Sequence, residues 1–207
     1  MSTHIYEETY RDYLAQLKGM DVSNLPERLG VEIEGNDIRI PLYGMPYTVF
    51  DGGVIDPHGR QPSLDVSVIL FKYLLLCPAF PPKGSDWVAY RDMKDTGPLT
   101  VFFDNDVERI ISDHFAGRPQ ALTDASRQLG AYPSELDVKY DVVAQFDGLP
   151  RVPVLMLFND GDNEFPAKCS VLFERRAEQY LDPESLAMLG SFLAHRLKKA
   201  DSRRQGT

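Results

Sequence analysis

The sequence predicts an α+β fold: a single compact domain with a mixed or mainly antiparallel sheet and flanking helices. Two observations carry this prediction. The segments that alternate apolar and polar residues come in pairs joined by tight turns, and the helical segments lie between these pairs. In a parallel α/β fold, a helix would instead follow nearly every strand.

The length of 207 residues fits one domain, because a chain of this size buries a sizeable core without disulfides or metals. We expect this domain to cover residues 1–200. The last segment, 201–207, reads DSRRQGT, and its polar composition predicts a disordered tail.

The N-terminal half is expected to hold two main helices and two hairpins. Apolar residues recur at helical spacing in both helices, and Ser63 is placed to cap the second. A Gly-Asn-Asp turn and an Asp-Gly-Gly turn separate the strands of the hairpins. The expected elements are a helix at 4–18, strands at 31–34, 38–42, 47–50 and 54–55, and a helix at 63–76.

The C-terminal half is expected to hold one more hairpin among helices. Its two apolar strands are joined by Asp-Gly-Leu-Pro, which is typical of a turn. Helical spacing of apolar residues predicts the helices. The expected elements are a short strand at 87–90, helices at 105–115 and 120–130, strands at 140–146 and 152–158, and helices at 171–179 and 183–199.

Composition limits the partners and the compartment. The formal net charge of -9 repels phosphate backbones, so we expect no nucleic-acid partner. The N-terminus lacks the apolar core of a signal peptide, and the longest apolar stretch is far shorter than the roughly 20 residues of a membrane span. Cys77 and Cys169 lie in apolar surroundings and read as free, buried thiols. The sequence therefore predicts a cytoplasmic protein without membrane contact.

The densest group of candidate functional residues is an acidic turn, Asp160–Glu164, that follows an apolar strand. Asp160, Asp162 and Glu164 resemble the start of a calcium loop. A full calcium loop needs glycine at its sixth position and glutamate at its twelfth, where this chain has Phe165 and Val171. The two positions that are most specific to a calcium loop do not match, so we assign no metal site.

Three interpretations of the acidic turn stay open. The first is a solvated turn whose carboxylates accept backbone N–H groups or pair with Arg151, Arg175 or Arg176. The second is a hard-cation site completed by oxygens from elsewhere in the fold. The third is an acid–base role for Asp162 or Glu164.

A second candidate region is the proline-rich loop and the strand that follows it. Trp87, Tyr90 and Arg91 combine aromatic surface with a guanidinium group, which is typical of ligand pockets and of partner-binding surfaces. The alternative is that Trp87 and Tyr90 pack against the sheet. The standard signatures GxGxxG, GxxxxGK[ST], GxSxG, HExxH and CxxC are absent, so we assign no catalytic residue.

An apolar helix, a tryptophan-containing segment and a strand that ends in Gly-Asp-x-Glu-Phe-Pro form one pattern. Its residues are Tyr73, Leu74, Gly84, Trp87, Tyr90, Arg91, Pro150, Pro153, Gly161, Asp162, Glu164, Phe165, Pro166, Leu172, Phe173, Tyr180 and Leu181. This pattern resembles an uncharacterised domain family of bacteria and archaea, common in anaerobes. Members of that family occur alone or joined to an iron–sulfur cluster-binding domain.

The resemblance implies a redox protein, with an iron–sulfur cluster or a corrinoid, as the partner of this domain. No cofactor is expected in the chain itself, because two cysteines cannot supply a four-thiolate cluster site.

Two functional hypotheses follow from the candidate residues and the resemblance. The first is a non-catalytic accessory or binding domain that acts beside such a redox protein through Trp87, Tyr90, Arg91 and the acidic turn. The second is an enzyme, or a small-ligand or metal-binding protein, that uses the acidic turn, with Arg91 or Arg151 holding an anionic group. The second function requires that the acidic turn and an arginine share one concave pocket.

Overall fold

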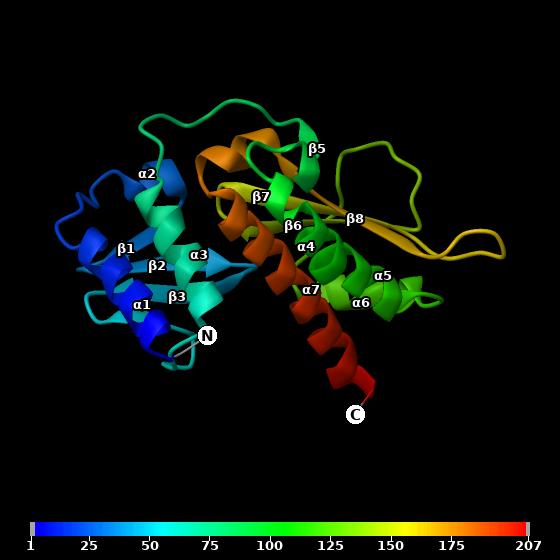
Figure 1. Cartoon of the computed structure of the whole chain (residues 1–207), viewed down its shortest axis with the longest axis horizontal. Coiled ribbons are helices and arrows are strands. Elements are labelled where there is room, and N and C mark those ends of the chain that lie inside the picture. Colours follow the sequence, from blue (N-terminus) through cyan, green and yellow to red (C-terminus); the bar gives the residue numbers. More distant parts are fainter. Residues whose placement is uncertain (1–2, 206–207) are drawn as a thin grey trace.

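The computed structural model describes residues 3–205, with side chains described for residues 7–202. It confirms the α+β fold as one compact body of strands and helices (Figure 1). The strands of the described residues form two antiparallel sheets of four strands each, where the sequence predicted one sheet. Over the same residues, no helix is both long enough and apolar enough to cross a membrane.

The first sheet is a meander of four short strands in sequence order. It confirms both hairpins predicted for the N-terminal half. Ile38, Ile40 and Leu42 are buried and alternate with more exposed neighbours, so one face of the sheet covers the core. The strands are β1 (Glu32–Glu34), β2 (Asp37–Leu42), β3 (Met45–Phe50) and β4 (Gly53–Ile55).

The second sheet has the strand order β5-β8-β7-β6, and every pair is antiparallel. Its central strand β7 is buried at seven consecutive residues, as expected of a strand that is covered on both faces. The pairing of β6 with β7 contains a bulge between Asp147 and Leu149. The strands are β5 (Trp87–Ala89), β6 (Val142–Leu149), β7 (Val152–Asn159) and β8 (Lys168–Glu174).

Helices lie in front of both sheets in the view of Figure 1. Helix α3 packs against α1 on one side and against α7 on the other, and α7 runs diagonally across the middle of the molecule (Figure 1). The α-helices are α1 (Thr3–Leu17), α2 (Leu25–Leu29), α3 (Leu64–Leu75), α4 (Thr100–Phe103), α5 (Arg109–Phe115), α6 (Pro119–Gln128) and α7 (Pro183–Gln205). A π-helical turn, Asp104–Glu108, joins α4 to α5, and 3₁₀ turns cover Tyr90–Asp92, Gly97–Leu99 and Arg175–Gln179.

The helix predicted at 171–179 is wrong. This segment begins in strand β8 and ends in a 3₁₀ turn. Cys169, Val171 and Phe173 are buried at every second residue, which is the period of a strand and not of a helix. Pairing with the buried strand β7 therefore outweighs the helical pattern of the charged residues that follow.

The disordered tail predicted at 201–207 is also wrong for its described part, because α7 continues to Gln205. Asp201 is 5% exposed and pairs with His114 and Arg118 at 2.9 Å each. These contacts hold the last turns of α7 beside α5 and the start of α6. Residues 206–207 lie outside the described residues.

The turn between β2 and β3 docks the first sheet onto the second. Tyr43 and Gly44 have positive φ angles of 47° and 72°, as in the type I′ turns of tight hairpins. The backbone N–H of Tyr43 donates to the carbonyl of Gly148, at the bulge of β6, over 3.0 Å. A Cβ at residue 148 would lie 3.0 Å from the carbonyl oxygen of Val152. Glycine at this bulge therefore permits the close approach of β6 to β7 and to Leu189 of α7.

The side chain of Tyr43 continues this contact into the core. Its hydroxyl is buried and donates to the carbonyl of Leu189, in α7, over 3.0 Å. Its ring packs against Phe146 of β6 and Phe192 of α7, with ring centroids 6.1 Å and 6.0 Å away. Burial raises the pKa of the Tyr43 phenol well above its usual value, so the hydroxyl stays a donor. Tyr43 thus connects the first sheet, the second sheet and α7.

Tyr73 of α3 makes a second connection. Its hydroxyl donates to the carbonyl of Leu29, in α2, over 2.6 Å and accepts the backbone N–H of Arg151 over 3.1 Å. Arg151 lies in the turn between β6 and β7, so Tyr73 ties α3 to α2 and to the second sheet.

Helix α7 packs closely on the segment that follows β5 because residue 190 is a glycine. A Cβ at Gly190 would lie 2.7 Å from the ring of Phe103 and 3.3 Å from Val107. The Phe103 ring is itself stacked on Tyr90, with centroids 4.2 Å apart. This contact fixes the rotation of α7 about its axis.

We expect Tyr43→Phe to lower the free energy of unfolding by about 1 kcal/mol, because the buried carbonyl of Leu189 loses a donor while the ring packing remains. Urea unfolding measures the difference. Tyr140→Phe is the matched control, because Tyr140 is 40% exposed and donates no hydrogen bond within the described residues. Equal losses in the two variants would contradict the role assigned to Tyr43.

We expect Gly190→Ala to lower the free energy of unfolding by about 1–3 kcal/mol, because the new methyl group overlaps the Phe103 ring. Part of this loss is offset, because alanine stabilises a helix by up to about 1 kcal/mol relative to glycine. Thermal unfolding measures the difference. Gly97→Ala is the control for an open site, because a Cβ at residue 97 would meet nothing within 4 Å. A stabilised Gly190→Ala protein would show that this contact is loose.

Candidate binding site between α3 and α7

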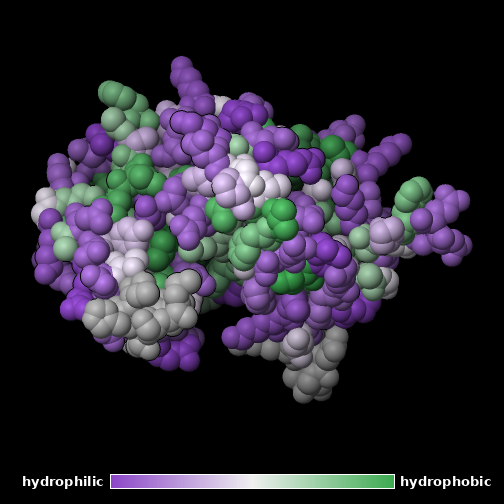
Figure 2. Space-filling model, viewed as in Figure 1, coloured by the Kyte–Doolittle hydropathy of each residue, from purple (hydrophilic) through white to green (hydrophobic). Residues whose placement is uncertain are grey.

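A trough of about 570 Å³ lies between α3 and α7, and the 3₁₀ turn and helix before the π turn close its third side. Figure 2 shows this face of the molecule, with apolar atoms gathered near its centre. The volume lies within the range of about 300–1,000 Å³ that is usual for small-ligand sites. The lining residues are Ser63, Asp65, Val66, Ile69, Leu99, Phe102, Glu184, Ala187, Met188, Ser191, Phe192 and His195.

The two helices that form the trough run antiparallel. Lys72, near the end of α3, pairs with Asp182, just before α7, at 2.9 Å. The start of α3 therefore lies beside the middle of α7, as Figure 1 shows. Val66, Ile69 and Ala187 are each at most 3% exposed and give the trough an apolar floor. An apolar ligand would remove further apolar surface from water there.

Two aromatic side chains form walls of the trough. Phe102 is 41% exposed although the next residue, Phe103, is 2% exposed, because successive residues of a helix point in different directions. Phe192 packs against Tyr43 on its other side. The residue that joins the two sheets therefore also supports one wall of the trough.

The polar end of the trough contains a histidine with a defined hydrogen bond. His195 Nδ1 lies 2.8 Å from the backbone carbonyl of Ser191 and 3.4 Å from its hydroxyl. A carbonyl accepts but cannot donate, so Nδ1 carries a proton. In the neutral imidazole, Nε2 is then an acceptor.

Two carboxylates also line the trough, and both belong to first turns of helices. Asp65 lies in the first turn of α3 and Glu184 in the first turn of α7. An acidic residue at this position is stabilised by the helix dipole. Within the described residues neither side chain forms a hydrogen bond or an ion pair, so both are available to a ligand.

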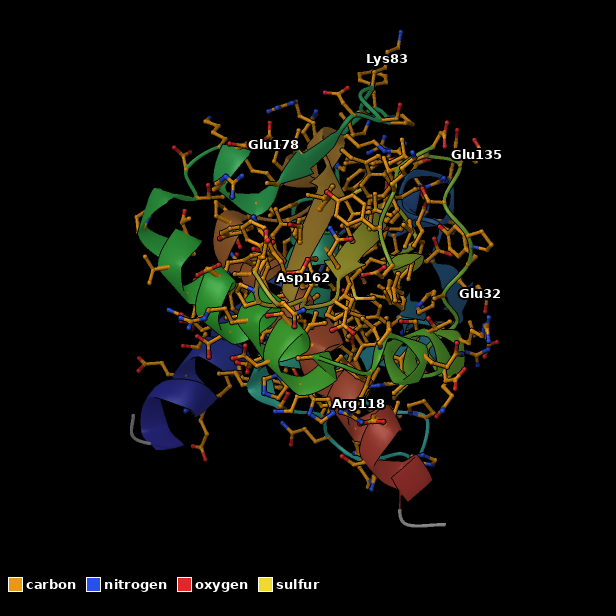
Figure 3. All side chains as sticks on the ribbon, turned by 90° about the vertical axis from the view of Figure 1, so that its right-hand side faces the viewer. Glu32, Lys83, Arg118, Glu135, Asp162 and Glu178 are labelled. Carbon is orange, nitrogen blue, oxygen red and sulfur yellow. The ribbon has the colours of Figure 1, made fainter. Side chains whose placement is uncertain are left out.

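The acidic turn lies elsewhere, at the tip of the β7–β8 hairpin. The hairpin projects to the right in Figure 1 and is seen end-on, with Asp162 labelled, in Figure 3. Asp162 accepts the backbone N–H groups of Glu164 and Phe165 over 2.8 Å each, and these bonds lower its pKa. Asp160 accepts the N–H of Gly117, just after α5, over 2.7 Å. The geometry agrees with a solvated turn whose carboxylates accept backbone N–H groups.

The arginines that could pair with the acidic turn are engaged at other places. Arg151 lies at the opposite end of β7, where its guanidinium donates to a backbone carbonyl of α2 over 2.8 Å. Arg175 pairs with Asp86 at 3.4 Å, and Arg176 pairs with Glu174. In the described structure, none of these three arginines pairs with the acidic turn.

The aromatic candidates do not form one surface. Tyr90 is 1% exposed and donates its hydroxyl to the carbonyl of Pro183 over 2.8 Å, so it is a core residue. Trp87 is half-buried in the edge strand β5. Arg91 is exposed and lines a smaller recess of about 230 Å³ together with Glu108.

Glu108 is a partly buried carboxylate that the sequence did not single out. It accepts the backbone N–H of Val171 over 2.9 Å, at a point of β8 that lies beyond the pairing with β5. Burial raises its pKa. We assign Glu108 a structural role, because it occupies a strand edge that would otherwise lack a partner. Among the described residues, no group of three or more His, Cys, Asp or Glu side chains could hold a metal ion.

None of the candidate functional residues named from the sequence lines the trough. Asp65, Glu184 and His195 are far apart in sequence, and only the packing of α3 on α7 brings them together. No local motif marks them. Phe102 is exposed at the trough, but the sequence alone does not reveal this exposure.

Comparison with known proteins finds one match. The model of a family described as Domain of unknown function (DUF3786) matches residues 21–196. The matched region contains α3, the part of α7 that lines the trough, and the acidic turn, and it confirms the resemblance to an uncharacterised domain family. No curated protein and no solved structure is significantly similar to the chain.

Asp162 provides a pH test of the acidic turn. Because backbone N–H groups lower the pKa of its carboxyl, the charged form stabilises the fold above the unfolded-state pKa of about 4. This stabilisation is lost as the pH falls through the lower, folded-state pKa. We expect Asp162→Asn to lower the midpoint of thermal unfolding at neutral pH, and we expect the difference from wild type to vanish in strong acid.

Glu164→Gln is the control, since the Glu164 side chain makes no hydrogen bond or ion pair within the described residues. It should leave the midpoint unchanged at both pH values. A pH-independent loss in Asp162→Asn would contradict the assigned role of the carboxylate.

Proposed function

We propose that this chain, which belongs to the family described as Domain of unknown function (DUF3786), is a non-catalytic binding domain. Its proposed site is the trough between α3 and α7, and its proposed ligand is a small molecule with an apolar body. One observation carries the proposal: the trough combines a buried apolar floor with polar side chains at its rim, in a volume of about 570 Å³. This combination is typical of small-ligand sites.

The side chains at the trough favour binding over catalysis. Ser191 and His195 are a nucleophile and a base that both line the trough, with the Ser191 hydroxyl 3.4 Å from Nδ1. Nδ1 of His195 faces Ser191 but donates to a carbonyl, so it cannot take the proton of the serine hydroxyl. The geometry therefore does not activate Ser191 for attack on a substrate.

The alternative function at the acidic turn has less support. That function requires an arginine and the carboxylates in one concave pocket. Arg91 lies at a recess with Glu108, and Arg151 lies at the other end of β7. Asp162 is directed to its own backbone. No observation favours a metal-binding or acid–base role there.

The partner remains a prediction from the sequence and from the resemblance. We expect a redox protein with an iron–sulfur cluster or a corrinoid, and no nucleic acid, because the net charge is -9. A cytoplasmic location also stays a prediction. A ligand held in the trough would leave the exposed hairpin tip free for such a partner.

The neutral fluorescent probe N-phenyl-1-naphthylamine tests the proposed site. We expect a saturable rise in its fluorescence with the wild-type chain, because the apolar floor removes the probe from water. Ser191→Trp should reduce the affinity at least about tenfold by filling the trough. Binding is measured by titrating the protein into the probe.

Lys199→Trp is the matched control, since Lys199 is an exposed residue of the same helix that does not line the trough. It should bind the probe like wild type. The proposal is wrong if the wild-type chain gives no saturable signal, or if Ser191→Trp binds as tightly as Lys199→Trp.

A further inference from the structure

We infer that the ligand of the trough is a cationic amphiphile: a small molecule with an apolar body and a protonated amino group. This inference rests on the proposed function and adds the chemical class of the ligand. Its basis is the set of polar groups along the trough, in which acceptors and negative charges predominate over donors.

The charged side chains that line the trough have one sign. Asp65 and Glu184 are both carboxylates, and no lysine or arginine is among the lining residues. Neither carboxylate has an ion-pair partner in the described residues. Other acidic groups nearby are already paired, as Asp182 is with Lys72 at 2.9 Å. The trough therefore presents two unneutralised negative charges beside an apolar floor, which favours a cation.

The neutral groups agree with this charge. Nδ1 of His195 donates to a backbone carbonyl, so Nε2 of the neutral ring is left as an acceptor. An ammonium group offers three donors and no acceptor, which matches carboxylate and imidazole acceptors. The first backbone N–H groups of α3 would attract an anion, but Asp65 lies in that same turn and opposes it.

The basic side chain beside the Phe192 wall belongs to Arg196. The Arg196 guanidinium lies over the Phe192 ring, 5.7 Å from its centroid, and also contacts Met45 of β3. It is not a lining residue. The ring of Phe192 separates this charge from the trough, since the same ring forms a wall.

The stretch of α7 that lines the trough, from Glu184 to His195, indicates an elongated ligand. Along α7, Glu184 and His195 are separated by about 16 Å, from the helical rise of 1.5 Å per residue. The Lys72–Asp182 pair sets the register of the antiparallel helices, so Asp65 lies opposite the stretch of α7 between Glu184 and His195. The apolar floor fills the space between them. An alkyl chain with an amino group at one end, or at both ends, fits this arrangement.

Competition between matched eight-carbon probes tests the inference. Octylammonium, octanol and octanoate have similar apolar bodies and differ in charge. We expect octylammonium to displace N-phenyl-1-naphthylamine at a concentration about five- to tenfold lower than octanol, and octanoate to be the weakest. The advantage of octylammonium should shrink as salt is added.

The double variant Asp65→Asn, Glu184→Gln should lose the preference for octylammonium, so that octylammonium and octanol displace the probe at similar concentrations. Both residues are exposed, so the fold should persist. Asp113→Asn, which changes an exposed carboxylate of α5 away from the trough, is the control and should keep the preference.

The possible results separate the two proposals. If octanol and octylammonium compete equally well, or if the double variant keeps the wild-type preference, the inference about charge is wrong while the proposed site stands. If the neutral probe itself does not bind, the proposed function is wrong. A preference for octanoate would overturn the charge assignment directly.

Discussion

The structure depends on the contact made by Tyr43. Its backbone meets the bulge of β6 at Gly148, and its hydroxyl meets the carbonyl of Leu189 in α7. Two antiparallel sheets have no continuous hydrogen-bonded ladder between them, so their relative position must come from such contacts. A type I′ turn, a backbone carbonyl at a bulge and a buried phenol together fix this position. Tyr73 adds a second connection between α3 and the turn from β6 to β7.

The trough is a consequence of this arrangement. One wall comes from α3, which lies on the first sheet, and the opposite wall comes from α7, which Gly190 holds against Phe103. Phe192 belongs to both features, since it packs on Tyr43 and lines the trough. A change in the docking of the sheets would therefore alter the width of the trough. The site therefore depends on how the two sheets are docked, because neither sheet forms it alone.

Local pattern was enough to predict most of the fold. The strands of β1 to β4, the hairpin of β6 with β7 and the helices α3 and α7 follow from alternation, helical spacing and turn residues. The segment at 171–179 was assigned incorrectly, because pairing with a buried strand decides the conformation of Val171 and Phe173. The tail was assigned incorrectly because Asp201 finds partners on α5 and at the start of α6. Both errors come from contacts that are distant in sequence.

The candidate site was harder to predict for the same reason. The acidic turn was predicted as a candidate site because three carboxylates are close in sequence. In the structure, the Asp162 carboxylate accepts backbone N–H groups of its own turn. The trough residues are ordinary in their local context. Asp65 and Glu184 resemble the acidic residues of many first helical turns, and Phe102 resembles a core residue. Only the packing of α3 on α7 gives them a common surface.

Methyl NMR of the methionines, during titration with octylammonium, tests the central claim most directly. Met188 lines the trough, whereas Met156 is buried in β7 and does not. The trough account expects a saturable shift of the Met188 methyl signal and an unchanged Met156 signal. Shifts at Met156 with no change at Met188 would contradict it, because the ligand would then bind outside the trough or loosen the fold.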